Sequence, residues 1–122
     1  MTTRKYIGCA IYIRVNTAAD RKAAQAQREA VEAYILDRLF QGWICAGTYE
    51  DVGCTDDLMR RPGLVGLLMD VVAGRLDCVA VQTIDRLAGH DDVLAKLMAM
   101  LRQHGVSLVE AATDCQIPDP AT

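Results

Sequence analysis

The chain has few aromatic residues and no long apolar run. Aromatic residues make up 5% of its 122 residues and hydrophobic residues 52%, so we expect a mostly aliphatic core. Charges interrupt the apolar segments well before the roughly 20 residues that a membrane span needs. Nothing at the N-terminus has the form of a signal peptide, since Arg4 and Lys5 precede a short strand-like stretch. These features favour one soluble domain in the cytoplasm.

A cysteine pair for metal binding and a surplus of basic residues are also lacking. The cysteines are odd in number and form no C-x-x-C pair. Cys9, Cys45 and Cys78 lie in apolar, strand-like runs, where cysteine acts as a small hydrophobe. We therefore expect free structural thiols and neither a metal site nor disulfides. The net charge is −3, which argues against tight independent DNA binding, because stand-alone DNA-binding proteins usually carry a basic surplus.

Strand-like and helix-like segments alternate along the chain. Strands are expected at residues 6–15, 43–49, 78–82 and 106–109. Helices are expected at residues 20–40, from Pro62 to Gly74, and from Asp91 or Asp92 to Gly105. This alternation predicts an α/β fold: a three-layer sandwich in which helices cover both faces of a mostly parallel sheet of four or five strands. Residues 1–112 would form this domain, and residues 113–122 an irregular C-terminal tail.

Polar residues gather where the expected strands end, and ligands of open α/β sheets bind beyond these carboxyl ends. The set comprises Arg14, Asn16, Asp51, Asp85 and Arg86. Arg61 begins a helix, whose free N–H groups also favour anions. Guanidinium groups bind phosphate oxygens well, so a phosphate site is one interpretation. The alternative is that the arginines are solvated charges paired with Asp51 and Asp85. No Walker or dinucleotide-binding glycine loop is present, so no nucleotide cofactor is expected.

Several short motifs follow one another in a specific order. They are Y-I-R-V-N-T at residues 12–17, Q-R-E-A at 27–30, D-V-G at 51–53, R-P-G-L at 61–64, and I-D-R-L at 84–87. In this order, over residues 6–114, the chain resembles the N-terminal catalytic domain of the serine recombinases, the resolvase/invertase family. The resemblance implies a resolvase-like fold and a part in DNA recombination.

The resemblance also implies a chemistry and a set of site residues. Members of this family attack the DNA backbone with a serine hydroxyl, which forms a 5′-phosphoserine link and frees a 3′-hydroxyl without metal or other cofactor. The implied phosphate-binding residues are Arg14, Arg61, Arg86, Gln27 and Asp51. Asp85 would orient an arginine or assist proton transfer.

The chain departs from the family pattern at three places. Asn16 stands where the family keeps its nucleophilic serine, and a carboxamide cannot form the covalent ester. The only serine, Ser107, lies in the last expected strand, and Thr17 is a weak substitute nucleophile. Gly89 replaces a family arginine, whose loss commonly costs a few kcal/mol of transition-state stabilisation. Asp56 adds a negative charge close to the expected DNA phosphate. We therefore expect a catalytically inactive relative, a pseudoenzyme.

Three functional hypotheses stay open. The first is a serine-recombinase catalytic domain that cannot cleave DNA. The second is a non-enzymatic regulatory or protein-interaction module that uses a resolvase-like fold. The third, a small phosphate-binding α/β protein, lacks a supporting loop motif.

The expected partners are DNA, bound weakly by this chain alone, or a full-length recombinase, with a possible weak homodimer and no membrane. The long helix and DNA-binding domain that follow in family members are absent after Pro120, so the chain is either an excised domain or a short protein.

Overall fold

A computed structural model describes residues 6–53, 58–87 and 91–116. Its centre is a five-stranded sheet with the order β2-β1-β3-β4-β5. The strands are β1 (Ile7–Val15), β2 (Trp43–Val52), β3 (Cys78–Val81), β4 (Ser107–Glu110) and β5 (Cys115–Gln116). Neighbours among the first four pair in parallel, and β5 pairs antiparallel with β4.

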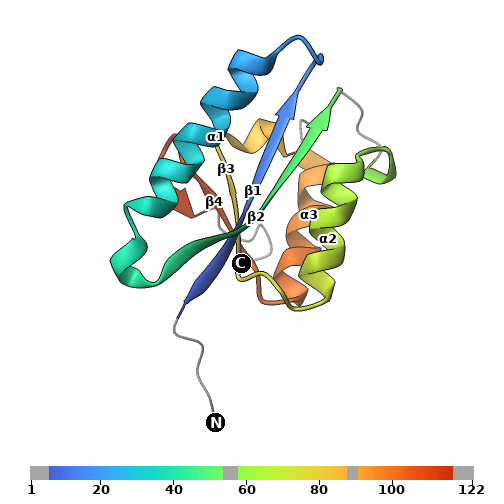
Figure 1. The fold of residues 1–122 in the computed structure, drawn as a ribbon. Coiled ribbons are helices and arrows are strands. Elements are labelled where there is room, and N and C mark those ends of the chain that lie inside the picture. The colour runs from blue at the N-terminus through green and yellow to red at the C-terminus, as the bar shows by residue number, and fades with distance from the viewer. Residues whose placement is uncertain (1–5, 54–57, 88–90, 117–122) are drawn as a thin grey trace.

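The helices form the two outer layers (Figure 1). They are α1 (Arg21–Leu36), α2 (Pro62–Val72) and α3 (Asp91–Gln103), with short 3-10 turns η1 (Leu39–Gln41), η2 (Leu58–Arg60) and η3 (Ile84–Arg86). α1 covers one face of the sheet, and α2 and α3 lie together over the other. This arrangement confirms the predicted three-layer α/β sandwich. No helix in the described parts of the chain is long and apolar enough to cross a membrane.

Alternating side chains of β1 divide the core into two halves. Ile11 and Ile13 pack with Val31 and Ile35 of α1. Tyr12, between them, packs in the other cluster, under α2 and α3. Successive side chains of a strand point to opposite faces, so a strand covered on both faces is apolar at nearly every position. This explains the almost continuous hydrophobic sequence of β1.

The first helix is shorter than predicted. α1 ends at Leu36, and residues 39–41 form η1. Arg38 terminates the helix, because its guanidinium donates to the carbonyl of Tyr34 at 2.9 Å and lies 3.5 Å from the centre of the Tyr34 ring. Gly42 then reverses the chain with φ of 91°, a left-handed conformation that glycine adopts without strain.

Two further expectations are wrong. The predicted irregular tail contains β5, whose residues Cys115 and Gln116 pair with β4. Asp114 makes the connecting turn with φ of 52°, which aspartate tolerates better than most residues. Residues 117–122 lie outside the described part. Cys45, predicted to act as a buried hydrophobe, is exposed, whereas Cys9 and Cys78 are buried free thiols.

Candidate phosphate-binding edge

Arg14 joins the end of β1 to the segment that follows β3. Its guanidinium Nη2 donates to the backbone carbonyl of Asp85, in η3, at 2.8 Å. Arg14 is half-buried and Asp85 is exposed. The guanidinium therefore lies at the carboxyl edge of the sheet, between two segments that are far apart in sequence.

Gln27 holds the backbone of Arg14 in place. Its Nε2 donates to the carbonyl of Arg14 at 3.0 Å, and its Oε1 accepts from the N–H of Arg14 at 3.3 Å. On one side of β1, the pairing with β3 extends only to Ile11. Beyond that point the amide of Gln27 makes the hydrogen bonds to Arg14 that a neighbouring strand would otherwise make. Gln27 is 1% exposed, and it is a positioning residue for Arg14 in this conformation.

Arg61 also reaches the segment after β3. It precedes α2, is 2% exposed, and donates from Nη1 to the carbonyl of Leu87 at 2.5 Å. Arg14 and Arg61 thus bond to neighbouring stretches of one backbone segment, residues 85–87. The structure brings these two predicted cations together, but it buries one of them.

Asp51 caps the beginning of α2. Its Oδ1 accepts from the N–H of Gly63 at 2.7 Å, and its Oδ2 accepts from the N–H of Leu64 at 2.8 Å. The hydroxyl of Tyr12 donates to the same Oδ2 at 2.7 Å. Burial, and then the bond to Asp51, raise the pKa of Tyr12 far above its usual value. The carboxylate of Asp51 thus accepts hydrogen bonds from α2 and from β1. It fixes the start of α2 and, through it, the position of the preceding Arg61.

The R-P-G sequence at the start of α2 has a local physical cause. Pro62 occupies the first helical turn, where its missing N–H costs nothing. A Cβ atom on Gly63 would lie 2.4 Å from the carbonyl oxygen of Glu50. Only glycine therefore lets α2 start so close to the end of β2, next to Asp51.

Glu110 is a supporting residue that the sequence analysis missed. It ends β4, and its Oε2 accepts from the N–H of Ile84 at 2.6 Å, while its Oε1 accepts from the hydroxyl of Thr113 at 2.8 Å. Glu110 therefore fixes the start of η3, the segment that Arg14 contacts. Its position at the carboxyl end of a strand next to β3 was the available signal.

The remaining predicted residues are placed as follows. Asn16 is exposed directly after β1, and the carbonyl of the preceding Val15 accepts from the N–H of Gly53 at 2.8 Å. The hydroxyl of Thr17 donates to Asp20 at 3.2 Å. The backbone of Arg86 lies in η3, whereas its side chain falls outside the described part of the structure. Asp56 and Gly89 also fall outside it.

The arrangement supplies cations and hydrogen-bond donors at the carboxyl edge of the sheet. These groups can bind an anionic oxygen, while the exposed carboxamide of Asn16 has no nucleophilic oxygen comparable to an alkoxide. Among residues 6–53, 58–87 and 91–116, no group of three or more histidine, cysteine, aspartate or glutamate side chains could hold a metal ion.

The chain is similar to one protein-family model and to several solved structures. The family model described as "Resolvase, N terminal domain" matches residues 9–121. Among solved structures, the N-terminal catalytic domain of TP901-1 integrase is similar, with 22% identity and a TM-score of 0.77 over 89% of this chain and 81% of that chain. A resolvase family site-specific recombinase from Streptococcus pneumoniae has 19% identity and a TM-score of 0.73 over 90% and 75%. A serine recombinase from Sulfolobus solfataricus has 19% identity and a TM-score of 0.71 over 94% and 73%. No curated protein sequence matches the chain significantly.

Proposed function

The chain belongs to the resolvase family of serine recombinases, and from that premise we propose that it docks on DNA phosphates without cutting the DNA. The supporting observation is that Arg14 and Arg61 both bond to residues 85–87 at the carboxyl edge of the sheet. A DNA phosphate at this edge would meet fixed positive charge and hydrogen-bond donors, which bind phosphate oxygens in a charge-assisted way.

The site residues have different parts in this proposal. Arg14, at the edge and half-buried, contacts the phosphate directly, together with Arg86. Arg61 is 2% exposed, so it acts through its electrostatic field and through the carbonyl of Leu87. Gln27 and Asp51 position Arg14 and α2, and Asp85 orients Arg14.

We attribute the absence of cleavage to two substitutions. Asn16 provides no hydroxyl for the attack on phosphorus, and covalent catalysis requires a nucleophile. Gly89 removes a cation that would stabilise the transition state. The acidic net charge of −3 further weakens DNA binding by this chain alone, and supports a role beside an active recombinase.

The docking surface is tested by removing one charge. Arg14→Gln should weaken binding to a short DNA duplex by about tenfold to a hundredfold at low salt, since hydrogen bonds to charged groups contribute roughly 1.5–3 kcal/mol. Fluorescence anisotropy measures the change. Arg75→Gln is the control, because Arg75 is exposed and precedes β3 at the opposite edge of the sheet. Equal affinity of Arg14→Gln and the unmodified protein would contradict the proposal.

The loss of cleavage is tested by restoring the hydroxyl. Neither the unmodified protein nor Asn16→Ser should form a covalent product with a DNA duplex, because Gly89 still lacks the arginine side chain. Denaturing gel electrophoresis of labelled DNA detects such a product. A covalent adduct with Asn16→Ser but not with the unmodified protein would contradict the role given to Gly89. An adduct with the unmodified protein would contradict the roles given to both Asn16 and Gly89.

The alternative is a non-enzymatic module that regulates a full-length recombinase through protein contacts. Asn16 and the acidic charge favour it over an active enzyme. A weak homodimer belongs to the same alternative. If DNA binding is absent even at low salt, this alternative replaces the docking proposal.

A further inference from the structure

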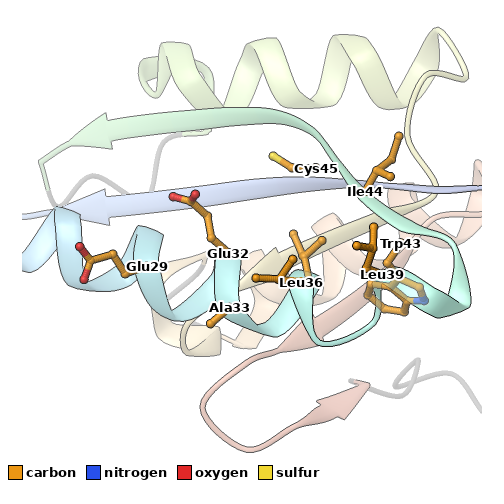
Figure 2. Close-up of a pocket in the computed structure, with 9 residues that line it drawn as sticks. Glu29, Glu32, Ala33, Leu36, Leu39, Trp43, Ile44 and Cys45 are labelled. Atoms are coloured by element: carbon orange, nitrogen blue, oxygen red, sulfur yellow. The ribbon is translucent and has the colours of Figure 1, made fainter.

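Arg14 and Arg61 lie at the carboxyl edge of the sheet, which we call the arginine edge. An apolar hollow lies away from it, at the amino end of β2. It has a volume of about 520 Å³ and is bordered by the second half of α1, by η1, and by the first residues of β2. Figure 2 shows Leu36, Leu39 and Trp43 at one end of the hollow, and the carboxylates of Glu29 and Glu32 towards the other.

Several apolar side chains of the hollow are left exposed by the core. Val31 and Ile35 already pack α1 against the sheet. Leu36 is 66% exposed, Leu39 is 49% exposed and Ile44 is 39% exposed. Apolar side chains gathered in a concave surface and left exposed are typical of interaction sites.

The glutamates give the hollow a negative charge. Glu29 accepts a hydrogen bond from the uncharged amide of Gln25 at 2.9 Å. Glu32 makes no hydrogen bond or ion pair within the described ranges of the chain. The cations nearest along the chain form other ion pairs, Arg28 with Glu50 and Arg38 with Asp114. An occupant with a basic group next to an apolar side chain would match both ends of the hollow.

β2 forms the edge of the sheet, because it pairs with β1 on one side and begins the strand order. Residues 44–46 of this strand are exposed. An exposed edge strand offers backbone hydrogen-bonding groups to an added strand, and extended peptides commonly bind proteins in this way. The geometry points to an extended partner rather than to a small molecule.

We propose that the hollow between α1 and β2 binds an extended segment of a partner protein in which every second side chain faces the hollow, apolar at one end and basic at the other. The apolar side chains enter next to Leu36 and Trp43, and a lysine or arginine meets Glu32. This goes beyond the phosphate-docking function, because no residue of the arginine edge takes part.

The test uses a short synthetic peptide with leucine, leucine and lysine at every second position and threonine between them, and a matched peptide with glutamate in place of lysine. The protein is labelled for NMR and titrated with each peptide. The lysine peptide should shift the amide signals of Glu32, Leu36 and Cys45 and should protect the exposed Cys45 thiol from alkylation. The glutamate peptide should do neither.

Two variants locate the contact. Glu32→Lys should weaken binding about two- to fivefold, as expected for one exposed ion pair, and Leu36→Asp should weaken it more. Met69→Asp is the control, because Met69 is 67% exposed on α2, on the other side of the sheet. Since Leu36 and Glu32 are both exposed, the variants should fold, and circular dichroism confirms that they do.

Three results would overturn the proposal. The first is equal binding of the two peptides or no binding of either. The second is a set of shifted signals that lies away from α1 and β2. The third is self-association of the unmodified protein in sedimentation that Leu36→Asp abolishes, which would assign the hollow to a second copy of the chain.

Discussion

Gln27 illustrates how one side chain can hold a functional arginine without touching a ligand. Its amide oxygen and nitrogen both bond to the backbone of Arg14. Its motif groups Gln27 with the expected phosphate-binding residues. Periodicity could only assign it to a helix, because the end of β3 pairing before Arg14 is a feature of the tertiary structure.

This role predicts a large effect of a small substitution. Gln27→Ala should lower the free energy of unfolding by about 2–3 kcal/mol, because buried backbone groups that lose their partners cost roughly 1–3 kcal/mol. Urea denaturation measures the change. Gln25→Ala is the matched control on the same helix, and since Gln25 is exposed, its effect should stay within about 0.5 kcal/mol. Equal effects of the two variants would contradict the positioning role of Gln27.

At the scale of elements, the junction between β2 and α2 is set by a close backbone approach. Asp51, next to the last residue of β2, is a buried carboxylate that accepts hydrogen bonds from the first N–H groups of α2. The sequence identified Pro62 as a helix start but assigned Asp51 to the ligand. An aspartate some ten residues before a helix carries no local capping pattern, so only the structure could identify this contact.

The close approach can be tested with two glycines of α2. Gly63→Ala should lower the free energy of unfolding by about 1–3 kcal/mol, because its methyl group would overlap the Glu50 carbonyl and force a backbone shift. Gly66→Ala should raise it by about 0.5–1 kcal/mol, since alanine favours helix and its Cβ would meet Tyr49 at an ordinary 3.9 Å. Thermal denaturation of both variants measures the two changes in stability. If Gly63→Ala were as stable as Gly66→Ala, the backbone between β2 and α2 could shift to accommodate the methyl group without loss of stability, which would contradict the account.

At the scale of the whole molecule, the order of strands and helices followed from the sequence. The apolar runs of β1 and β3 and the glycine at residue 42 are local signals, and these elements formed where expected. The burial of Arg61 and the support of η3 by Glu110 depend on residues far apart in the sequence. Such contacts leave little trace in a single sequence, which is why the sequence could not tell which of the predicted site residues are buried and which are exposed.

The two surfaces of the molecule are separated along its strands. The arginine edge lies at the carboxyl ends of β1 and β3, whereas the apolar hollow borders the start of β2. In Figure 1 the two ends of β2 lie at opposite ends of the fold. A DNA phosphate and a protein segment could therefore be bound at the same time without overlap.

The central claim, that the arginine edge engages DNA phosphates, is tested most directly by the salt dependence of duplex binding. Affinity of the unmodified chain is measured by fluorescence anisotropy over a series of salt concentrations. The logarithm of the affinity should fall linearly with that of the salt concentration, by about 0.9 for each phosphate neutralised. Weak binding with a clear negative slope is the predicted result. No binding at low salt, or binding that salt does not change, would contradict the claim.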